Sequence, residues 1–186
     1  MSEYQRPEPC GTQPITAPRL NLRKFKDYDA PAMFEWLNDG KVLRYFVAPP
    51  PKSIEEARQM IQSWRGQYAE NTFMRWCIAE ATDNSAVGEI AASVDIETSC
   101  AEVEYVIAPE ARRKGYASEA LSAIIDYLHK IGIHRVTAEI RDTNGPSAKT
   151  AEAAGMVLEG ILTDALIDRD GNFYDVGLFA HVSETD

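Results

Sequence analysis

The sequence has little cysteine, no long apolar run and few basic residues. Its three cysteines, Cys10, Cys77 and Cys100, cannot all pair with one another, and their spacing matches no zinc pattern. The longest apolar stretches are a few residues long, far short of the roughly 20 that a membrane-spanning helix needs. Residues 1–16 hold no apolar core flanked by basic residues, so we expect no signal peptide. These absences predict a cytoplasmic protein without a structural metal, a disulfide framework or a membrane partner.

Acidic residues outnumber basic ones. The chain has 29 Asp and Glu against 19 Lys and Arg, which gives a net charge of −10 at pH 7. This balance disfavours nucleic acid as a partner, because binding to phosphates rests on Lys and Arg. With 45% hydrophobic and 26% charged residues, the composition is that of an ordinary globular protein.

The first part of the chain differs from the rest. Residues 1–16 contain Pro7, Pro9, Gly11 and Pro14 without apolar periodicity, which predicts a flexible N-terminal tail or an edge segment. The pattern that follows is regular, with no repeat and no linker composition, so we expect a single domain over 17–186.

Hydrophobic periodicity predicts a mixed α/β domain. Strands are expected over 19–25, 73–80, 86–94, 101–107, 135–140, 156–167 and 173–180, and helices over 29–40, 53–68, 115–131 and 146–154. The helix over 115–131 has the clearest signal, because seven apolar side chains fall on one face: Ala117, Ala120, Leu121, Ile124, Ile125, Leu128 and Ile131.

The junction between the strand over 101–107 and this helix carries the strongest chemical signal. Its residues are Arg112-Arg113-Lys114-Gly115-Tyr116-Ala117. A glycine at a helix start lets backbone amides approach a ligand, and these amides and the helix dipole favour an anion such as a pyrophosphate. The alternative is a solvated basic turn before an ordinary helix, and these residues alone do not decide between the two.

Several segments together extend this signal. Arg112-x-x-Gly115-x-Ala117 matches the pyrophosphate loop of the GNAT superfamily of acyl-CoA-dependent N-acyltransferases. The segments 104–110 and 115–121 are similar to its fourth strand and cofactor helix. Further matches are Asn144-Gly145-Pro146-Ser147, Gly155-Met156, Gly160 and Asp175. The chain therefore resembles this superfamily, and within it the RimJ/RimL-like branch, over about 18–182.

The resemblance implies a mostly antiparallel sheet that splays between its fourth and fifth strands and holds the pantetheine arm of acetyl-CoA there. Acetyl-CoA would be the co-substrate, and no metal would be needed. The cofactor-binding residues implied are Tyr105, Val106 and Ile107 through their main chain, the loop and helix start Arg112, Arg113, Lys114, Gly115, Tyr116, Ala117 and Ser118, and Asn144 and Ser147 near the sulfur.

The catalytic candidates are two carboxylates and one hydroxyl. Glu102 and Glu104 share one face of the strand expected to hold the thioester, so either could remove a proton from an amine, alone or through water. They could also simply face solvent. Many members of the superfamily carry a tyrosine where this chain has Ala151, and the resemblance gives the contact with the sulfur to Ser147 instead. Ser147 could equally serve as a helix cap.

The function expected is transfer of an acetyl group from acetyl-CoA to a primary amine by direct attack in a ternary complex. The acceptor would be a protein N-terminal amine of the ribosomal-protein type or a small-molecule amine. A homodimer is possible, since the related branch often forms one. The alternative from another class is a non-catalytic acyl-CoA-binding sensor or interaction module, which would need the loop but not Glu102, Glu104 or Ser147.

Overall fold

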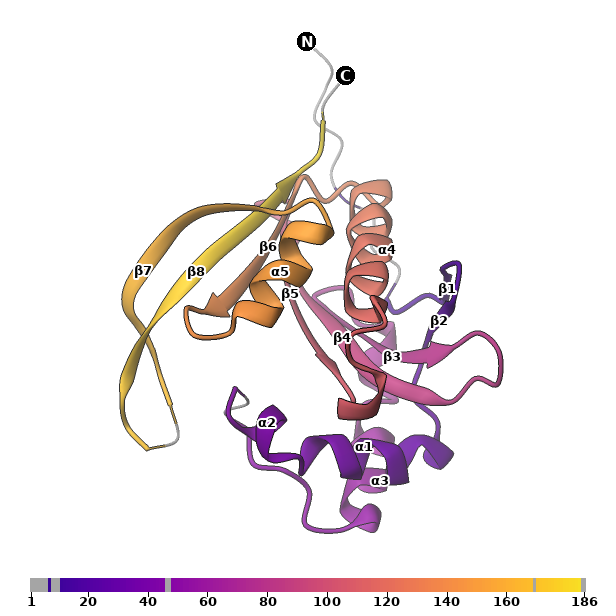
Figure 1. The fold of residues 1–186 in the computed structure, drawn as a ribbon. Coiled ribbons are helices and arrows are strands. Elements are labelled where there is room, and N and C mark those ends of the chain that lie inside the picture. The colour runs from indigo at the N-terminus through magenta and orange to yellow at the C-terminus, as the bar shows by residue number, and fades with distance from the viewer. Residues whose placement is uncertain (1–6, 8–10, 46–47, 169, 185–186) are drawn as a thin grey trace.

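The computed structural model describes residues 7, 11–45, 48–168 and 170–184. These residues form an eight-stranded sheet in the order β1-β2-β3-β4-β5-β6-β8-β7, which is antiparallel except between β5 and β6 (Figure 1). The strands are β1 (Ile15–Thr16), β2 (Leu20–Arg23), β3 (Phe73–Glu80), β4 (Ala86–Asp95), β5 (Cys100–Ile107), β6 (Arg135–Arg141), β7 (Val157–Ile167) and β8 (Phe173–Val182). The helices are α1 (Ala30–Leu37), α2 (Gly40–Leu43), α3 (Ile54–Ser63), α4 (Tyr116–Lys130) and α5 (Gly145–Ala153), with short 3-10 turns η1 (Asp27–Asp29), η2 (Gln67–Ala69) and η3 (Pro109–Ala111). The predicted mixed α/β fold is confirmed.

Helices cover both faces of the sheet. Neighbouring side chains on a strand point to opposite faces, and β3 shows this directly. Trp76 meets Tyr127 of α4 edge-on, with ring centroids 5.8 Å apart. Arg75 lies over the ring of Trp64, the C-cap residue that follows α3, at 4.3 Å. The sheet thus has α4 on one face and the α1–α3 layer on the other (Figure 1).

The sheet splays between β5 and β6. β5 pairs with β4 along its whole length, from Cys100 to Ile107. It pairs with β6 only from Cys100 to Glu102, opposite Arg135 to Thr137. From Val103 onward, the edge of β5 that faces β6 has no strand partner among the described residues. These are the two strands between which the splay was predicted, because the short β1 shifts the numbering by one.

The prediction of a flexible tail is wrong for residues 11–16. Ile15 and Thr16 pair with β2 as its outer neighbour. Thr12 is 1% exposed, and its hydroxyl accepts a hydrogen bond from the Arg75 amide at 3.1 Å. Backbone groups in this segment therefore find partners in the domain, as expected of an edge segment. Residues 1–6 and 8–10 lie outside the described residues.

Two helix predictions need correction. The first helix ends at Leu37, and Gly40 begins α2 instead of ending α1, because the Asp39 carboxylate accepts the amides of Lys41 and Val42 as an N-cap. The second helix ends at Ser63 instead of continuing to Tyr68, which lies in η2. The Tyr68 hydroxyl accepts the Phe25 amide at 2.9 Å, and this contact fixes Tyr68 outside the helical repeat.

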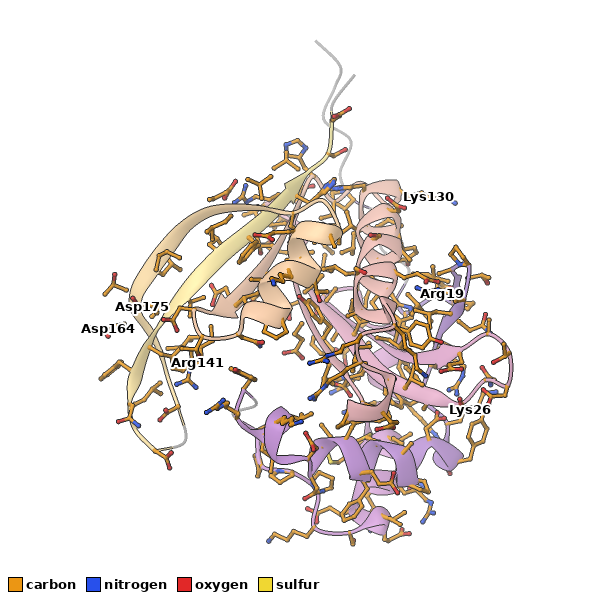
Figure 2. All side chains as sticks on the ribbon, in the orientation of Figure 1. Arg19, Lys26, Lys130, Arg141, Asp164 and Asp175 are labelled. Atoms are coloured by element: carbon orange, nitrogen blue, oxygen red, sulfur yellow. The ribbon has the colours of Figure 1, made fainter. Side chains whose placement is uncertain are left out.

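The β7–β8 hairpin projects from the domain as a curved ribbon (Figure 1). Every residue of β7 is exposed. A bulge interrupts the ribbon where Asp164 adopts a φ of 49°, and the Asp164 amide donates to the Asp175 carboxylate at 2.9 Å (Figure 2). Exposed apolar side chains on the hairpin are Val157, Leu158, Ile161, Leu162, Leu166, Ile167, Phe173 and Val182. Within the described ranges, no helix has both the length and the apolar character to cross a membrane.

Candidate functional site

The loop before α4 has the backbone geometry of an anion site. Gly115 is the N-cap of α4 with a φ of 80°, and Arg113 also has a positive φ of 63°. Left-handed residues that alternate with extended or right-handed ones turn successive amides toward one concave side. The 15-residue helix that follows adds its N-terminal dipole. The predicted loop residues therefore surround a helix start that can hold phosphate oxygens.

The basic side chains of the loop have different surroundings. Arg112 donates from Nε to the Ile107 carbonyl at 3.2 Å, and its Nη2 lies 3.8 Å from the Asp39 carboxylate. Lys114 pairs with Glu80 at 3.4 Å. Arg113 is exposed. Positive charge therefore lies at the loop surface. Two of the three basic side chains form ion pairs: Arg112 with Asp39, the N-cap of α2, and Lys114 with Glu80 of β3.

Arg19, which sequence reasoning missed, braces the same loop. Its Nη1 donates to the Lys114 carbonyl at 2.8 Å, and its guanidinium lies 5.0 Å from the Tyr116 ring centroid. Its Nε and backbone amide both donate to Glu119, each at 2.7 Å. Figure 2 shows Arg19 beside α4, with Lys130 marking the opposite end of the helix. A β-carbon at position 115 would lie 3.3 Å from Arg19 Nη2, so the glycine leaves room for the Arg19 guanidinium beside the loop.

The helix start itself is packed lightly. Tyr116, Ala117 and Ser118 are each partly buried. The Ser118 hydroxyl donates to the Gly115 carbonyl at 3.0 Å, within the first turn of α4. The amides of a first helical turn have no acceptor within the helix, so those at the start of α4 can receive an anion.

Tyr105 and Ser147 bridge the splayed gap. The Ser147 hydroxyl donates to the Tyr105 hydroxyl at 2.9 Å, and the Tyr105 hydroxyl donates to the Ser147 carbonyl at 3.0 Å. Asn144 caps α5, because its side chain accepts the Ser147 amide at 3.4 Å. The capping role considered for Ser147 therefore belongs to Asn144. The structure brings Asn144 and Ser147 to the open edge of β5 that also carries Val106 and Ile107.

A row of carboxylates lies on the opposite face of β5, toward the α1–α3 layer. Glu102 and Glu104 are both exposed there. The pKa of Glu102 is raised, first by partial burial and then by the negative charges of Glu139 and Glu104. Glu102 also borders a hollow of about 370 Å³ that includes Thr137 and Ser93. A carboxylate with a raised pKa at the rim of a hollow can accept a proton from an amine.

Glu89 of β4, which sequence analysis also missed, is a buried carboxylate on the same face of the sheet. It is 4% exposed and pairs with Arg75 at 2.6 Å, while its Oε2 has no hydrogen-bond partner among the described residues. Burial raises its pKa against the lowering effect of Arg75, and Glu104 raises it further. A correct pairing of β3 with β4 would have revealed the Arg75–Glu89 pair. Cys77 lies directly opposite Glu89, so Arg75, two residues earlier on the same face, is the diagonal neighbour of Glu89.

The structure describes two of the three cysteines. Cys77 is fully buried, and burial raises the pKa of its thiol well above the usual value. Cys100 donates to the Thr98 carbonyl at 3.4 Å, and Cys10 lies outside the described residues. No group of three or more His, Cys, Asp or Glu side chains suited to a metal ion occurs in the part of the chain that the structure describes.

Comparison with known proteins agrees with this geometry. The family description "Acetyltransferase (GNAT) domain" matches residues 19–157. The uncharacterized N-acetyltransferase YoaA of Bacillus subtilis (strain 168) is 31% identical over 166 residues, covering 88% of this chain and 93% of YoaA.

Two solved structures share the fold. RimL, described as a ribosomal L7/L12 alpha-N-protein acetyltransferase in complex with coenzyme A, has a TM-score of 0.81 and 21% identity, over 94% of this chain and 100% of RimL. The microcin C7 self immunity acetyltransferase MccE, in complex with acetyl-CoA and AMP, has a TM-score of 0.80 and 19% identity, over 89% of this chain and 93% of MccE.

Proposed function

The chain belongs to the GNAT family of acetyltransferases, and we propose that it moves an acetyl group from acetyl-CoA to a primary amine by direct attack in a ternary complex. The observation that carries the proposal is the conjunction of the loop before α4 with the open edge of β5. The loop offers amides and positive charge for a pyrophosphate, and the edge offers unpaired backbone for an extended pantetheine arm. Acetyl-CoA contains both groups in one molecule.

The chain's residues fit this co-substrate. Arg112 to Ser118 would hold the pyrophosphate at the helix start, where the left-handed Gly115 leaves the cradle free of a β-carbon. Main-chain groups of Tyr105, Val106 and Ile107 would pair with the arm. One of their amides would donate to the thioester carbonyl and stabilise the negative charge that develops there. Acetyl-CoA supplies the activated acyl group.

Glu102 is our proposed general base. An alkyl ammonium has a pKa near 10.4 by analogy with lysine, so the acceptor must lose a proton before it attacks. Glu102 has a raised pKa and is exposed at the rim of the hollow that Ser93 and Thr137 also line, where it would accept that proton directly or through water. Glu104 supports it as a neighbouring negative charge. Ser147 would contact the sulfur and help to protonate the leaving thiolate.

The acceptor that the site favours is a cationic amine. Glu102, Glu104 and Glu139 place negative charge on one face of the splayed strands, which attracts an ammonium group. Both candidate classes carry such a group: a protein N-terminus, as the name of RimL states for that protein, or a small-molecule amine.

A non-catalytic acyl-CoA sensor is the competing function. It would bind acetyl-CoA through the same loop and turn over nothing. Isothermal titration of the purified protein with acetyl-CoA, with ATP as the control, tests binding first. Release of CoA with a panel of amines and N-terminal peptides then separates the two functions. Saturable binding without turnover of any acceptor would favour the sensor, and no binding at millimolar acetyl-CoA would contradict both.

We also propose that the protein forms a homodimer through the β7–β8 ribbon. The β7–β8 ribbon exposes apolar side chains on both faces, and a surface of this kind is stabilised when a second copy covers it. Light scattering after size exclusion should give the mass of two chains. Ile161→Glu should give the mass of one, while Ile54→Glu, an exposed apolar side chain on α3, should leave the mass unchanged. A wild-type monomer would contradict the dimer without affecting the proposed chemistry.

A further inference from the structure

The contact between Tyr105 and Ser147 joins two hydroxyl groups across the open edge of β5. We propose that these hydroxyls form a proton relay in which the Tyr105 phenol resupplies the proton that Ser147 gives to the leaving sulfur. This inference rests on the proposed function. It assigns a chemical role to the Tyr105 side chain, in addition to the main-chain contact expected of this residue.

The geometry places the two oxygens at transfer distance. Ser147 Oγ and the Tyr105 hydroxyl oxygen are 2.9 Å apart. In the resting arrangement the Tyr105 proton points to the Ser147 carbonyl, 3.0 Å away, and the serine proton points to the phenol. Because hydroxyl protons rotate, both can reverse without movement of the heavy atoms. Ser147 then donates to a group in the gap, and Tyr105 donates to Ser147.

Serine alone is a poor proton source for a thiolate. An aliphatic hydroxyl that gave up its proton would become an alkoxide, a far stronger base than a thiolate. A phenol has a pKa near 10, close to that of a thiol, and so can supply the proton at low cost. Tyr105 is partly buried, and burial raises the pKa of its phenol, so it keeps its proton at neutral pH. The relay thus begins fully protonated.

The atoms balance in this sequence. The amine nitrogen forms a bond to the acetyl carbon, and the carbon–sulfur bond breaks with its electron pair going to sulfur. Sulfur takes the Ser147 proton while Ser147 takes the Tyr105 proton. Tyr105 is reprotonated from water, and the proton from the amine leaves through Glu102. The net products are an amide and CoA thiol.

A purely structural contact would give the same static picture, so the test must respond to the acidity of the phenol. Tyr105→Phe keeps the ring and removes the hydroxyl. We expect its kcat to fall by about 10²-fold, the scale of general acid catalysis, with little change in KM for acetyl-CoA. Tyr28→Phe is the matched control, because Tyr28 is an exposed tyrosine, 60% exposed, and lies outside the site. Replacement of Tyr105 by 3-fluorotyrosine, a more acidic phenol, should move the alkaline limb of kcat to lower pH.

A binding measurement tests the relay without turnover. In the 3-fluorotyrosine protein, the fluorine resonance at position 105 reports ionisation of the phenol. A bound CoA thiolate beside Ser147 would disfavour the phenolate, so the phenol should titrate at a pH higher by about 1 with CoA than with desulfo-CoA. Identical titrations, or a Tyr105→Phe enzyme within twofold of wild type, would overturn the relay. A wild-type protein that turns over no amine would instead overturn the proposed function.

Discussion

Arg19 donates a hydrogen bond to each carboxylate oxygen of Glu119: its backbone amide donates to Oε1 and its Nε to Oε2, each at 2.7 Å. The same guanidinium reaches the Lys114 carbonyl. Arg19, which directly precedes β2, thereby contacts Glu119 in the first turn of α4 and Lys114 in the loop before Gly115. Arg19 is therefore a positioning residue for the loop that would hold the phosphates of acetyl-CoA.

Arg19→Ala should weaken acetyl-CoA binding about tenfold, because a charge-assisted hydrogen bond contributes about 1.5 kcal/mol and tenfold in affinity is about 1.4 kcal/mol. Isothermal titration measures the change. Arg58→Ala is the matched control, since Arg58 also forms an ion pair, with Glu55 on α3, away from the loop. Equal affinity in the two variants would show that the loop holds its shape without Arg19.

Substitution of Gly115 should impair both folding and binding. Its φ of 80° costs a residue with a side chain about 1–2 kcal/mol. Gly115→Ala should therefore lower the free energy of unfolding by that amount, and Gly115→Glu should abolish acetyl-CoA binding by filling the cradle with a charged group. Gly66→Ala is the control, because Gly66 has a φ of −67° and open space around its α-carbon. Unchanged affinity in Gly115→Glu would remove the loop from the site.

Glu102 and Glu104 should separate in their pH profiles. Glu102→Gln should lower kcat by about 10²-fold or more at pH values where Glu102 is ionised in the wild type, because the neutral amide accepts no proton, and the difference should shrink below the pKa of Glu102. In the wild type, activity should fall as the pH drops through the raised pKa of Glu102.

Glu104→Gln removes one of the charges that raise this pKa, so its acid limb should move to lower pH while kcat at neutral pH is largely kept. The exposed Glu55→Gln is a control for loss of charge. If Glu104→Gln is inactive and Glu102→Gln resembles the wild type, Glu104 is the base.

Glu89 should make stability depend on pH in an unusual direction. Its native pKa is raised, so the folded protein binds a proton more tightly than the unfolded chain. The contribution of Glu89 to the free energy of unfolding is therefore present below the ordinary glutamate pKa and declines as the pH rises through the native pKa. Urea unfolding of Glu89→Gln across this range should lack the decline, whereas the exposed Glu70→Gln should retain it. Parallel curves for Glu89→Gln and wild type would contradict this assignment.

Sequence patterns predicted the elements whose information is local. α4 was visible because its apolar residues recur with the helical period and glycines flank it. The loop was visible because glycine and basic residues stand next to each other in the chain. The strands over 73–80 and 86–94 were visible through their local apolar pattern, and the structure pairs them as β3 and β4.

The features that sequence analysis missed join residues distant in the chain. Arg19 and Glu119 are 100 positions apart, and Tyr105 and Ser147 are 42 apart. No local propensity records such a contact, because it arises when α4 packs across β2 and when β6 and α5 return beside β5. The end of α3 at Ser63 was missed for a related reason: the hydrogen bond from the Phe25 amide to Tyr68 outweighs the helical spacing of Tyr68.

The short pairing of β5 with β6 gives this sheet an unusual kind of edge. Outer edge strands invite pairing with other chains, which can lead to aggregation. The unpaired edge of β5 begins at Val103 and lies inside the sheet, because β6 lies across the gap from it. The Tyr105–Ser147 contact bridges this gap. The unpaired backbone groups of β5 therefore lie between two strands of the same sheet and not at its outer border.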